Sequence, residues 1–149
     1  MATIPATTKG LRHVRKSITF NGGANLGNLG DDVPVFTTTG RVLITYLTMA
    51  CTTSLTGSNS DTTLRITSSA RDQYAIPRLL GDAVSGTIGS VEGGATGFGT
   101  DVTETIHTAS NVVLAVEDGG AGADVTGGTI VIDAWYRPIT DDGALAGDD

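Results

Sequence analysis

Few side chains in this sequence are of the types that carry out covalent or acid–base chemistry. The chain has two histidines, His13 and His107, and one cysteine, Cys51. A nucleophilic triad needs a base beside its nucleophile, and histidine is the usual base. Neither histidine lies near a G-x-S-x-G motif, and Cys51 ends the apolar run YLTMAC, which favours a small buried side chain. The sequence therefore predicts no catalytic residue and no enzyme activity.

The carboxylates and glycine loops also lack a defined binding pattern. The segment EDGGAGADVTGG places Glu117, Asp118 and Asp124 among glycines, where their oxygens could hold a hard cation. The spacing does not fit a 12-residue calcium loop, so a plain β-turn region is favoured, and the histidines and cysteine show no zinc spacing. GGANLGNLG is followed by neither a lysine nor a helix, which argues against a phosphate site. We predict no metal and no cofactor.

The composition and charge favour a β-rich protein with many turns. Of the 149 residues, 39% are hydrophobic, 17% are charged and 21 are glycine. Threonine is frequent, whereas the long helix-forming side chains are sparse. The net charge of −7 argues against general binding to nucleic acid, which needs a basic surface. No apolar run reaches the length of a membrane span and residues 1–16 lack a signal-peptide core, so we expect a protein made in the cytosol that binds no membrane.

Alternation of apolar and polar residues predicts about eight β-strands and no amphipathic helix. The predicted strands cover 14–20, 33–40, 41–51, 62–68, 101–109, 111–117 and 129–138, and 74–76 could form either a further strand or one short helical turn. Eight antiparallel strands in two packed sheets is the count of a jelly roll. We therefore expect an all-β, antiparallel β-sandwich that is jelly-roll-like, and a sandwich of another topology is the main alternative.

The segment 41–51, RVLITYLTMAC, is the best candidate for a central core strand. Strict alternation would place Val42, Ile44 and Tyr46 on one face, and Leu43, Leu47 and Met49 on the other. Because both faces are then apolar, we expect this strand to be covered on two sides.

The two ends of the chain carry opposite charges. We predict an extended N-terminal arm over 1–13, a single β-sandwich domain over 14–140 and a flexible acidic tail over 141–149. The basic residues near the N-terminus are Lys9, Arg12, Arg15 and Lys16. They could attract the acidic tail of a neighbouring subunit or a partner, or both ends could simply be solvated.

Two stretches resemble small proteins of tailed-phage and prophage virions. The segment 16–57, KSITFNGGANLGNLGDDVPVFTTTGRVLITYLTMACTTSLTG, and the closing GTIVIDAWYRPIT are similar to strands and turns of head decoration (cement) proteins. The resemblance covers about 60 of the residues. It implies an accessory capsid protein, often a trimer, that binds the major capsid protein on the outer surface of the virion head.

For such a protein, the residues expected to bind the capsid or a neighbouring subunit come from three parts of the chain. They are Lys9, Arg12, Arg15, Lys16, Phe98 and Trp135. Trp135 and Tyr136 are adjacent in a predicted strand, so one should lie in the core and the other should be free to anchor an interface. The arm is expected to pair with an adjacent subunit by strand addition.

Two other functions stay open at this point. One is a component of a phage tail or fibre tip that binds host carbohydrate through exposed aromatic side chains. The other is a small hydrolase that uses Glu104 or His107.

Overall fold

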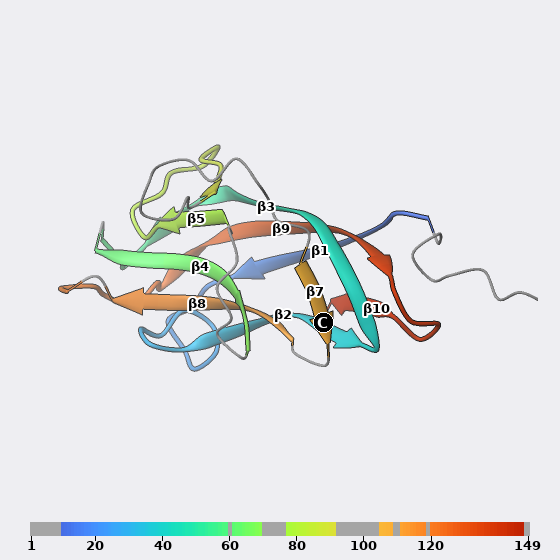
Figure 1. Ribbon diagram of the computed structural model, residues 1–149. Helices are drawn as coiled ribbons and strands as arrows, with labels where there is room; N and C mark the ends of the chain where they lie inside the picture. The colour runs from blue at the N-terminus through green and yellow to red at the C-terminus, as the bar shows by residue number, and fades with distance from the viewer. Residues whose placement is uncertain are drawn as a thin grey trace, which may run out of the picture.

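The computed structural model describes residues 10–59, 61–69, 77–91, 105–108, 111–118 and 120–147. All regular secondary structure in these ranges is β-strand (Figure 1). The described residues therefore contain no helix that could cross a bilayer. The strands are β1 (Arg12–Thr19), β2 (Asp32–Thr39), β3 (Arg41–Thr56), β4 (Thr62–Ser68), β5 (Pro77–Leu80), β6 (Ser90–Val91), β7 (Thr105–Thr108), β8 (Val112–Asp118), β9 (Gly127–Pro138) and β10 (Ala144–Gly147). The predicted strand at 74–76 lies outside the described residues.

The strands pair in the order of a jelly roll. One sheet has the order β1-β9-β3-β7 and the other the order β10-β2-β8-β4-β5-β6. Eight strands form four nested antiparallel pairs, β1 with β9, β2 with β8, β3 with β7 and β4 with β5, as if one long hairpin were rolled over on itself. The predicted antiparallel, jelly-roll-like sandwich is therefore confirmed. The short strands β6 and β10 extend the two edges of the six-stranded sheet.

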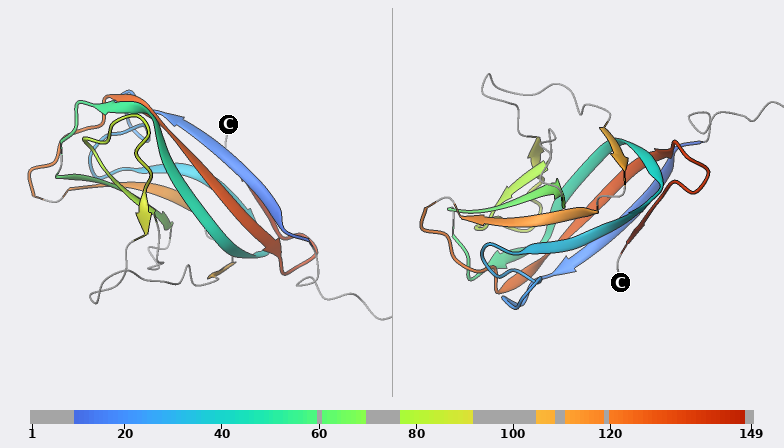
Figure 2. Two further views of the ribbon diagram at one scale, coloured as in Figure 1. Left: turned by 90° about the horizontal axis from the view of Figure 1, so that it is seen from above. Right: turned by 60° about the horizontal axis from the view of Figure 1, so that its bottom comes forward.

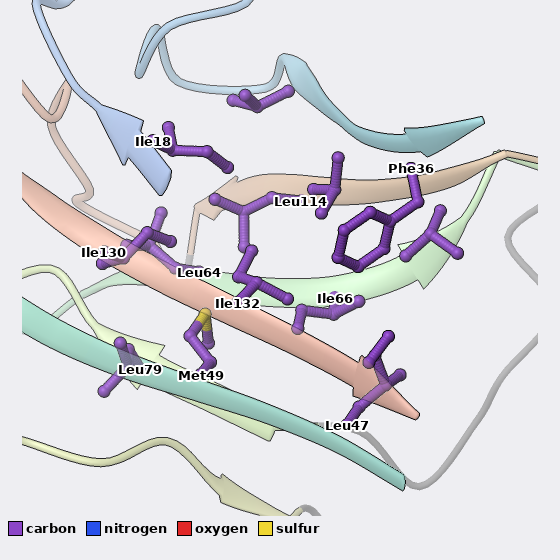
Figure 3. Packing of buried hydrophobic residues seen from close by; sticks show 14 of the residues in the cluster. Ile18, Phe36, Leu47, Met49, Leu64, Ile66, Leu79, Leu114, Ile130 and Ile132 are labelled. Carbon is purple, nitrogen blue, oxygen red and sulfur yellow. The ribbon is translucent and has the colours of Figure 1, made fainter. Parts of the chain in front are cut away.

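The core fills the space between the two sheets (Figure 3). Every second residue of β9 points into it, so Ile130, Ile132 and Ala134 are fully buried, as their alternation predicts. Leu114 on β8 and Phe36 on β2 approach from the opposite sheet and are also fully buried. Burying one such side chain stabilises the fold by about 1.5–3 kcal/mol relative to leaving it exposed.

A β-bulge in β3 changes the faces that its side chains occupy. Ile44 lies opposite Tyr136 and Tyr46 lies opposite Trp135, so Thr45 is the extra residue. Its hydroxyl donates to the Trp135 carbonyl oxygen at 3.1 Å. The expected alternation is therefore wrong after Ile44, because Leu47 joins the buried face while Tyr46 is 49% exposed. The expectation of two covered faces is also wrong within the described residues.

Both predicted chain ends differ from the structure. Arg12 and His13 belong to β1, where they pair with Tyr136 and Trp135, although both were assigned to the arm. Residues 144–147, assigned to a flexible tail, form β10 along β2, and Leu145 is buried. Figure 2 shows β10 running beside β1 at one corner of the sandwich. Tyr136 joins the two sheets there, because its hydroxyl donates to the Leu145 carbonyl oxygen at 3.5 Å.

Candidate binding face

The outer side of the four-stranded sheet gathers aromatic and charged side chains in a small area. Its strands β1, β9 and β3 run side by side as a curved band (Figure 2). Because side chains alternate across a strand, the residues of β9 next to the buried Ala134 and Tyr136 point outward. We call this surface the aromatic–basic face and define it by His13, Arg15, Tyr46, Asp133, Trp135 and Arg137.

An aromatic row crosses the three strands of this face. The strand register places Trp135 between His13 on β1 and Tyr46 on β3. The ring centroids of Trp135 lie 4.8 Å from His13 and 5.4 Å from Tyr46, and both pairs are tilted. Such pairs add about 0.5–1.5 kcal/mol beyond the area that they bury, so they hold one another in place. The bulge at Thr45 matters here because it turns Tyr46 outward and completes the row.

A charged row lies next to the aromatic row. Arg15 on β1 faces Asp133 on β9 and makes a bidentate pair, with Nε 2.8 Å from Oδ1 and a terminal nitrogen 3.0 Å from Oδ2. His13 Nε2 lies 2.6 Å from the same Oδ1. The Asp133 side chain is only 11% exposed, whereas the Arg15 side chain is 64% exposed. The carboxylate therefore acts as an anchor that fixes Arg15 and His13, while the guanidinium keeps a surface open to a partner.

These contacts set the protonation of Asp133. The hydrogen bond from Arg15 is the main cause that lowers the pKa of Asp133, burial opposes it, and His13 lowers it further. The hydrogen bond to Asp133 in turn raises the pKa of Arg15. At neutral pH the face therefore carries an ionised carboxylate that Arg15 and His13 partly cover.

Acidification is expected to weaken the fold through Asp133. The pKa of Asp133 is lower in the folded protein than in the unfolded chain, where a carboxyl titrates near pH 4. The ionised Asp133 therefore stabilises the fold above about pH 4, and this contribution is lost as the pH falls through the folded pKa. In Asp133→Asn this contribution is absent at every pH. The difference in unfolding free energy between wild type and Asp133→Asn should therefore shrink between pH 6 and pH 3, as urea titrations can measure.

A second aspartate provides the control for this titration. Asp118 accepts the backbone N–H groups of Gly122 and Gly120, both at 2.8 Å, and these bonds lower its pKa. Asp118→Asn should remove its own acid dependence and leave that of Asp133 in place. A stability gap between wild type and Asp133→Asn that stays constant from pH 6 to pH 3 would contradict the assigned ion pair.

The structure separates the residues that the sequence analysis grouped as partner-binding. Arg15 and Trp135 come together on the aromatic–basic face, and Tyr136 is buried, so the prediction that the Trp–Tyr pair points in opposite directions is confirmed. Arg12 is exposed but has the alternation phase of the inner side of β1. Lys16 shares that phase and lines a separate groove. Lys9 and Phe98 lie outside the described residues.

Sequence reasoning missed four members of the face, one of which is Arg137. His13 was placed in the arm, Tyr46 was placed on the buried side, and Asp133 was not singled out. One signal was available for Asp133, because a single carboxylate inside the apolar run TIVIDAWY needs a partner if the strand is buried. Its partners could not be read from the sequence, because His13 and Arg15 lie about 120 residues away along the chain.

The acidic glycine turn, the other candidate site, has its carboxylates engaged in structural contacts. Asp118 caps its own turn, and Asp124 accepts the backbone N–H of Leu29 at 2.8 Å. Glu117 pairs with Arg65. Within the described part of the chain, no three histidine, cysteine, aspartate or glutamate side chains form a group that could hold a metal ion. Cys51 is buried at 1% exposure, in agreement with its predicted packing role.

The chain was compared with known proteins at three levels. No family model, no curated protein and no solved structure matches it.

Proposed function

We propose that this protein is a structural component of a tailed-phage virion that binds the outer surface of the assembled head as a decoration protein. The major capsid protein is the partner, and the aromatic–basic face is the surface that binds it. The protein is made in the host cytoplasm and joins the particle as an oligomer. It acts by adhesion and has no catalytic role.

The aromatic–basic face is the observation that carries this proposal. Trp, Tyr and Arg are the residue types enriched among the side chains that dominate binding energy at protein interfaces. Here Trp135, Tyr46 and Arg15 lie on adjacent strands of one rigid sheet and are held by ring contacts and by Asp133. A surface fixed in this way loses little side-chain entropy on binding, which favours affinity for a protein partner.

Repetition on a lattice would strengthen a modest contact. An exposed ion pair between a basic side chain of this protein and the capsid would contribute only about 0–1 kcal/mol. A trimer with one face per subunit meets the regular copies of a capsid protein at high effective concentration, so three weak contacts give stable attachment. The resemblance to head decoration proteins favours this oligomer.

A carbohydrate-binding component of a tail or fibre tip is the second candidate. The observation that favours it is the aromatic row itself, because sugar rings stack on exposed aromatic side chains. The tilt between Trp135 and Tyr46, with an interplanar angle of 52°, makes the row uneven rather than a single flat platform. We therefore place the capsid first and treat glycan binding as an outcome that the experiments can return.

Location on the particle is the direct test of the proposed function. Virions released by the strain that carries this gene would be purified and imaged by cryo-electron microscopy, beside particles from a strain with the gene deleted. We expect density on the outside of the head that the deletion removes. Density at the tail tip, together with hits on a glycan array, would replace the proposal by the second candidate. Absence of the protein from virions would refute both.

Replacing Trp135 with alanine should weaken attachment to the head. The recombinant variant would be added to deletion particles, and bound protein would be measured by sedimentation. We expect an affinity loss of about 30-fold per face, which corresponds to ~2 kcal/mol. Tyr46→Ala should cause a smaller loss in the same direction.

The matched control for these variants is Leu80→Ala. Leu80 is 40% exposed and lies on β5 of the six-stranded sheet, whereas the aromatic–basic face belongs to the four-stranded sheet. This variant should bind like wild type, and thermal unfolding should show that all three variants are folded. Equal losses for Trp135→Ala and Leu80→Ala would show that the partner binds elsewhere.

A further inference from the structure

A groove opens between β1 and β2 at the point where β10 ends. It has a volume of about 400 Å³ and is lined by residues 16–19 of β1, 33–34 of β2 and 24–26 of the connecting loop. Ile18 and Val33 form a buried apolar floor, and Leu26 is 37% exposed at the rim. The groove continues the line of β10, because β10 pairs only with Phe36–Thr39 of β2 and stops at Gly147.

The β1 side of this groove presents backbone groups that can pair with another strand. The Phe20 N–H donates to the Gly128 carbonyl oxygen at 3.0 Å, which sets the alternation of hydrogen bonds between β1 and β9. Even-numbered residues of β1 therefore bond to β9, and the N–H and C=O groups of Ser17 and Thr19 point the other way. Among the described residues, no strand pairs with this edge of β1.

The other sides of the groove limit what can enter it. Pro34 on β2 has no N–H, so β2 offers a poor edge there. β10 lies against the first half of β1, because a Cβ added at Gly147 of β10 would lie 3.5 Å from the Arg15 carbonyl oxygen. This part of the β1 edge is therefore covered. The open edge is therefore about four residues long, or ~13 Å, which fits one short extended segment.

Residues 1–9 of this chain have the pattern that such a groove requires. In MATIPATTK, the small or apolar Ala2, Ile4 and Ala6 alternate with Thr3, Pro5 and Thr7. An added strand would place Ile4 and Ala6 on the apolar floor and the threonines toward solvent. Nine extended residues span ~30 Å, more than twice the length of the open edge.

Pro5 determines the direction of the added strand. If Ile4 and Ala6 both face inward, Pro5 lies opposite Ser17. In an antiparallel strand the Ser17 carbonyl oxygen would need a hydrogen bond from the N–H of Pro5, and proline has no N–H. In a parallel strand, Ser17 instead bonds to the residues before and after the one opposite it. With Pro5 opposite Ser17, these partners are the Ile4 C=O and the Ala6 N–H, so the proline is tolerated.

A parallel direction in turn excludes the arm of the same molecule. Parallel neighbours need a crossover connection of about a dozen residues or more. Ala6 is separated from Arg12, the first residue of β1, by only five residues. We therefore propose that residues 1–9 of a second copy of this chain insert beside Ser17 and Thr19 as a parallel strand, which links subunits by arm exchange. The exchange is independent of capsid binding, so either proposal can fail alone.

Cysteine cross-linking tests this contact directly. In a Cys51→Ala background, a tagged chain with Ile4→Cys would be co-expressed with an untagged chain carrying Lys16→Cys, the residue opposite Ile4 in this register, and then oxidised. We expect a disulfide-linked pair that contains one copy of each chain. The control pairs Ile4→Cys with Val84→Cys, a residue that is 63% exposed on the segment between β5 and β6 and should not cross-link.

The oligomeric state provides a second readout. The full chain should have the mass of a dimer or a closed ring in native mass spectrometry. Deletion of residues 1–9, or Ile4→Asp, which places a charge on the apolar floor, should raise the dissociation constant at least tenfold while the fold is kept. A monomeric full chain, an oligomer that the deletion leaves unchanged, or the absence of a cross-link between the tagged and the untagged chain would overturn the proposal.

Discussion

Phe36→Ala is expected to lower the free energy of unfolding by about 3–5 kcal/mol. The Phe36 side chain is fully buried and stands between the sheets, near Leu114 and Ile66 (Figure 3). β2 bulges between Pro34 and Phe36, and β10 covers its other edge from Phe36 onward. Both flanks of Phe36 are thus fixed by paired strands, so the core can collapse only partly around the missing ring.

Urea unfolding followed by circular dichroism would measure this loss. Phe36→Leu removes less volume and should cost less than Phe36→Ala, in proportion to the smaller cavity. Ile88→Ala, at a side chain that is 72% exposed, should change stability by no more than about 0.5 kcal/mol. A cost for Phe36→Ala as small as that for Ile88→Ala would mean that Phe36 does not lie in the core.

The strands themselves could be predicted because their alternation is regular. In β9, Ile130, Ile132, Ala134 and Tyr136 share one face in the sequence pattern, and all four are buried. The strand order is a different kind of information. Strands β1 and β9 are neighbours although more than 100 residues separate them, and no local pattern encodes that pairing. The strand count of a jelly roll favoured the correct topology without excluding another sandwich.

Errors arose where the local pattern allowed two answers. In β3 both alternation phases are apolar, so the sequence could not show that Thr45 is an extra residue, and only the register against β9 reveals it. In the tail, ALAG has one large apolar side chain, Leu145, which is too weak a pattern to predict a strand. Its position is set by pairing with β2 and by the Tyr136 hydroxyl.

The candidate binding face could be predicted only in part for the same reason. Trp135 was identified because an adjacent aromatic pair must place its members on opposite faces of a strand. Its neighbours His13 and Tyr46 could not be identified, because they come from two other strands and one of them depends on the bulge. A single binding residue is therefore readable from a strand, whereas a binding surface requires the pairing between strands.

Gly27→Ala is expected to destabilise the protein by about 2–4 kcal/mol, through two separate causes. The φ angle of Gly27 is +117°, which side chains other than glycine rarely adopt. A Cβ at this position would also lie within 3.0 Å of the Val125 carbonyl oxygen and 3.1 Å from a ring carbon of Phe20. Val125 cannot move away easily, because its N–H donates to the Gly27 carbonyl oxygen at 2.8 Å. Both the backbone cost and the clash must therefore be absorbed.

Gly30→Ala separates these two causes, because it lies in the same loop and keeps only the first. Its φ angle is +88°, yet a Cβ there would meet nothing within 4 Å. We expect this variant to lose about 1 kcal/mol, the backbone cost alone. The gap between the two variants in urea unfolding then measures how tightly the loop before β2 is packed against the segment before β9. Equal losses of unfolding free energy would mean that the backbone around Gly27 can shift to accommodate a methyl group. The loop that lines the β1–β2 groove would then be less tightly packed than the contacts of Gly27 indicate.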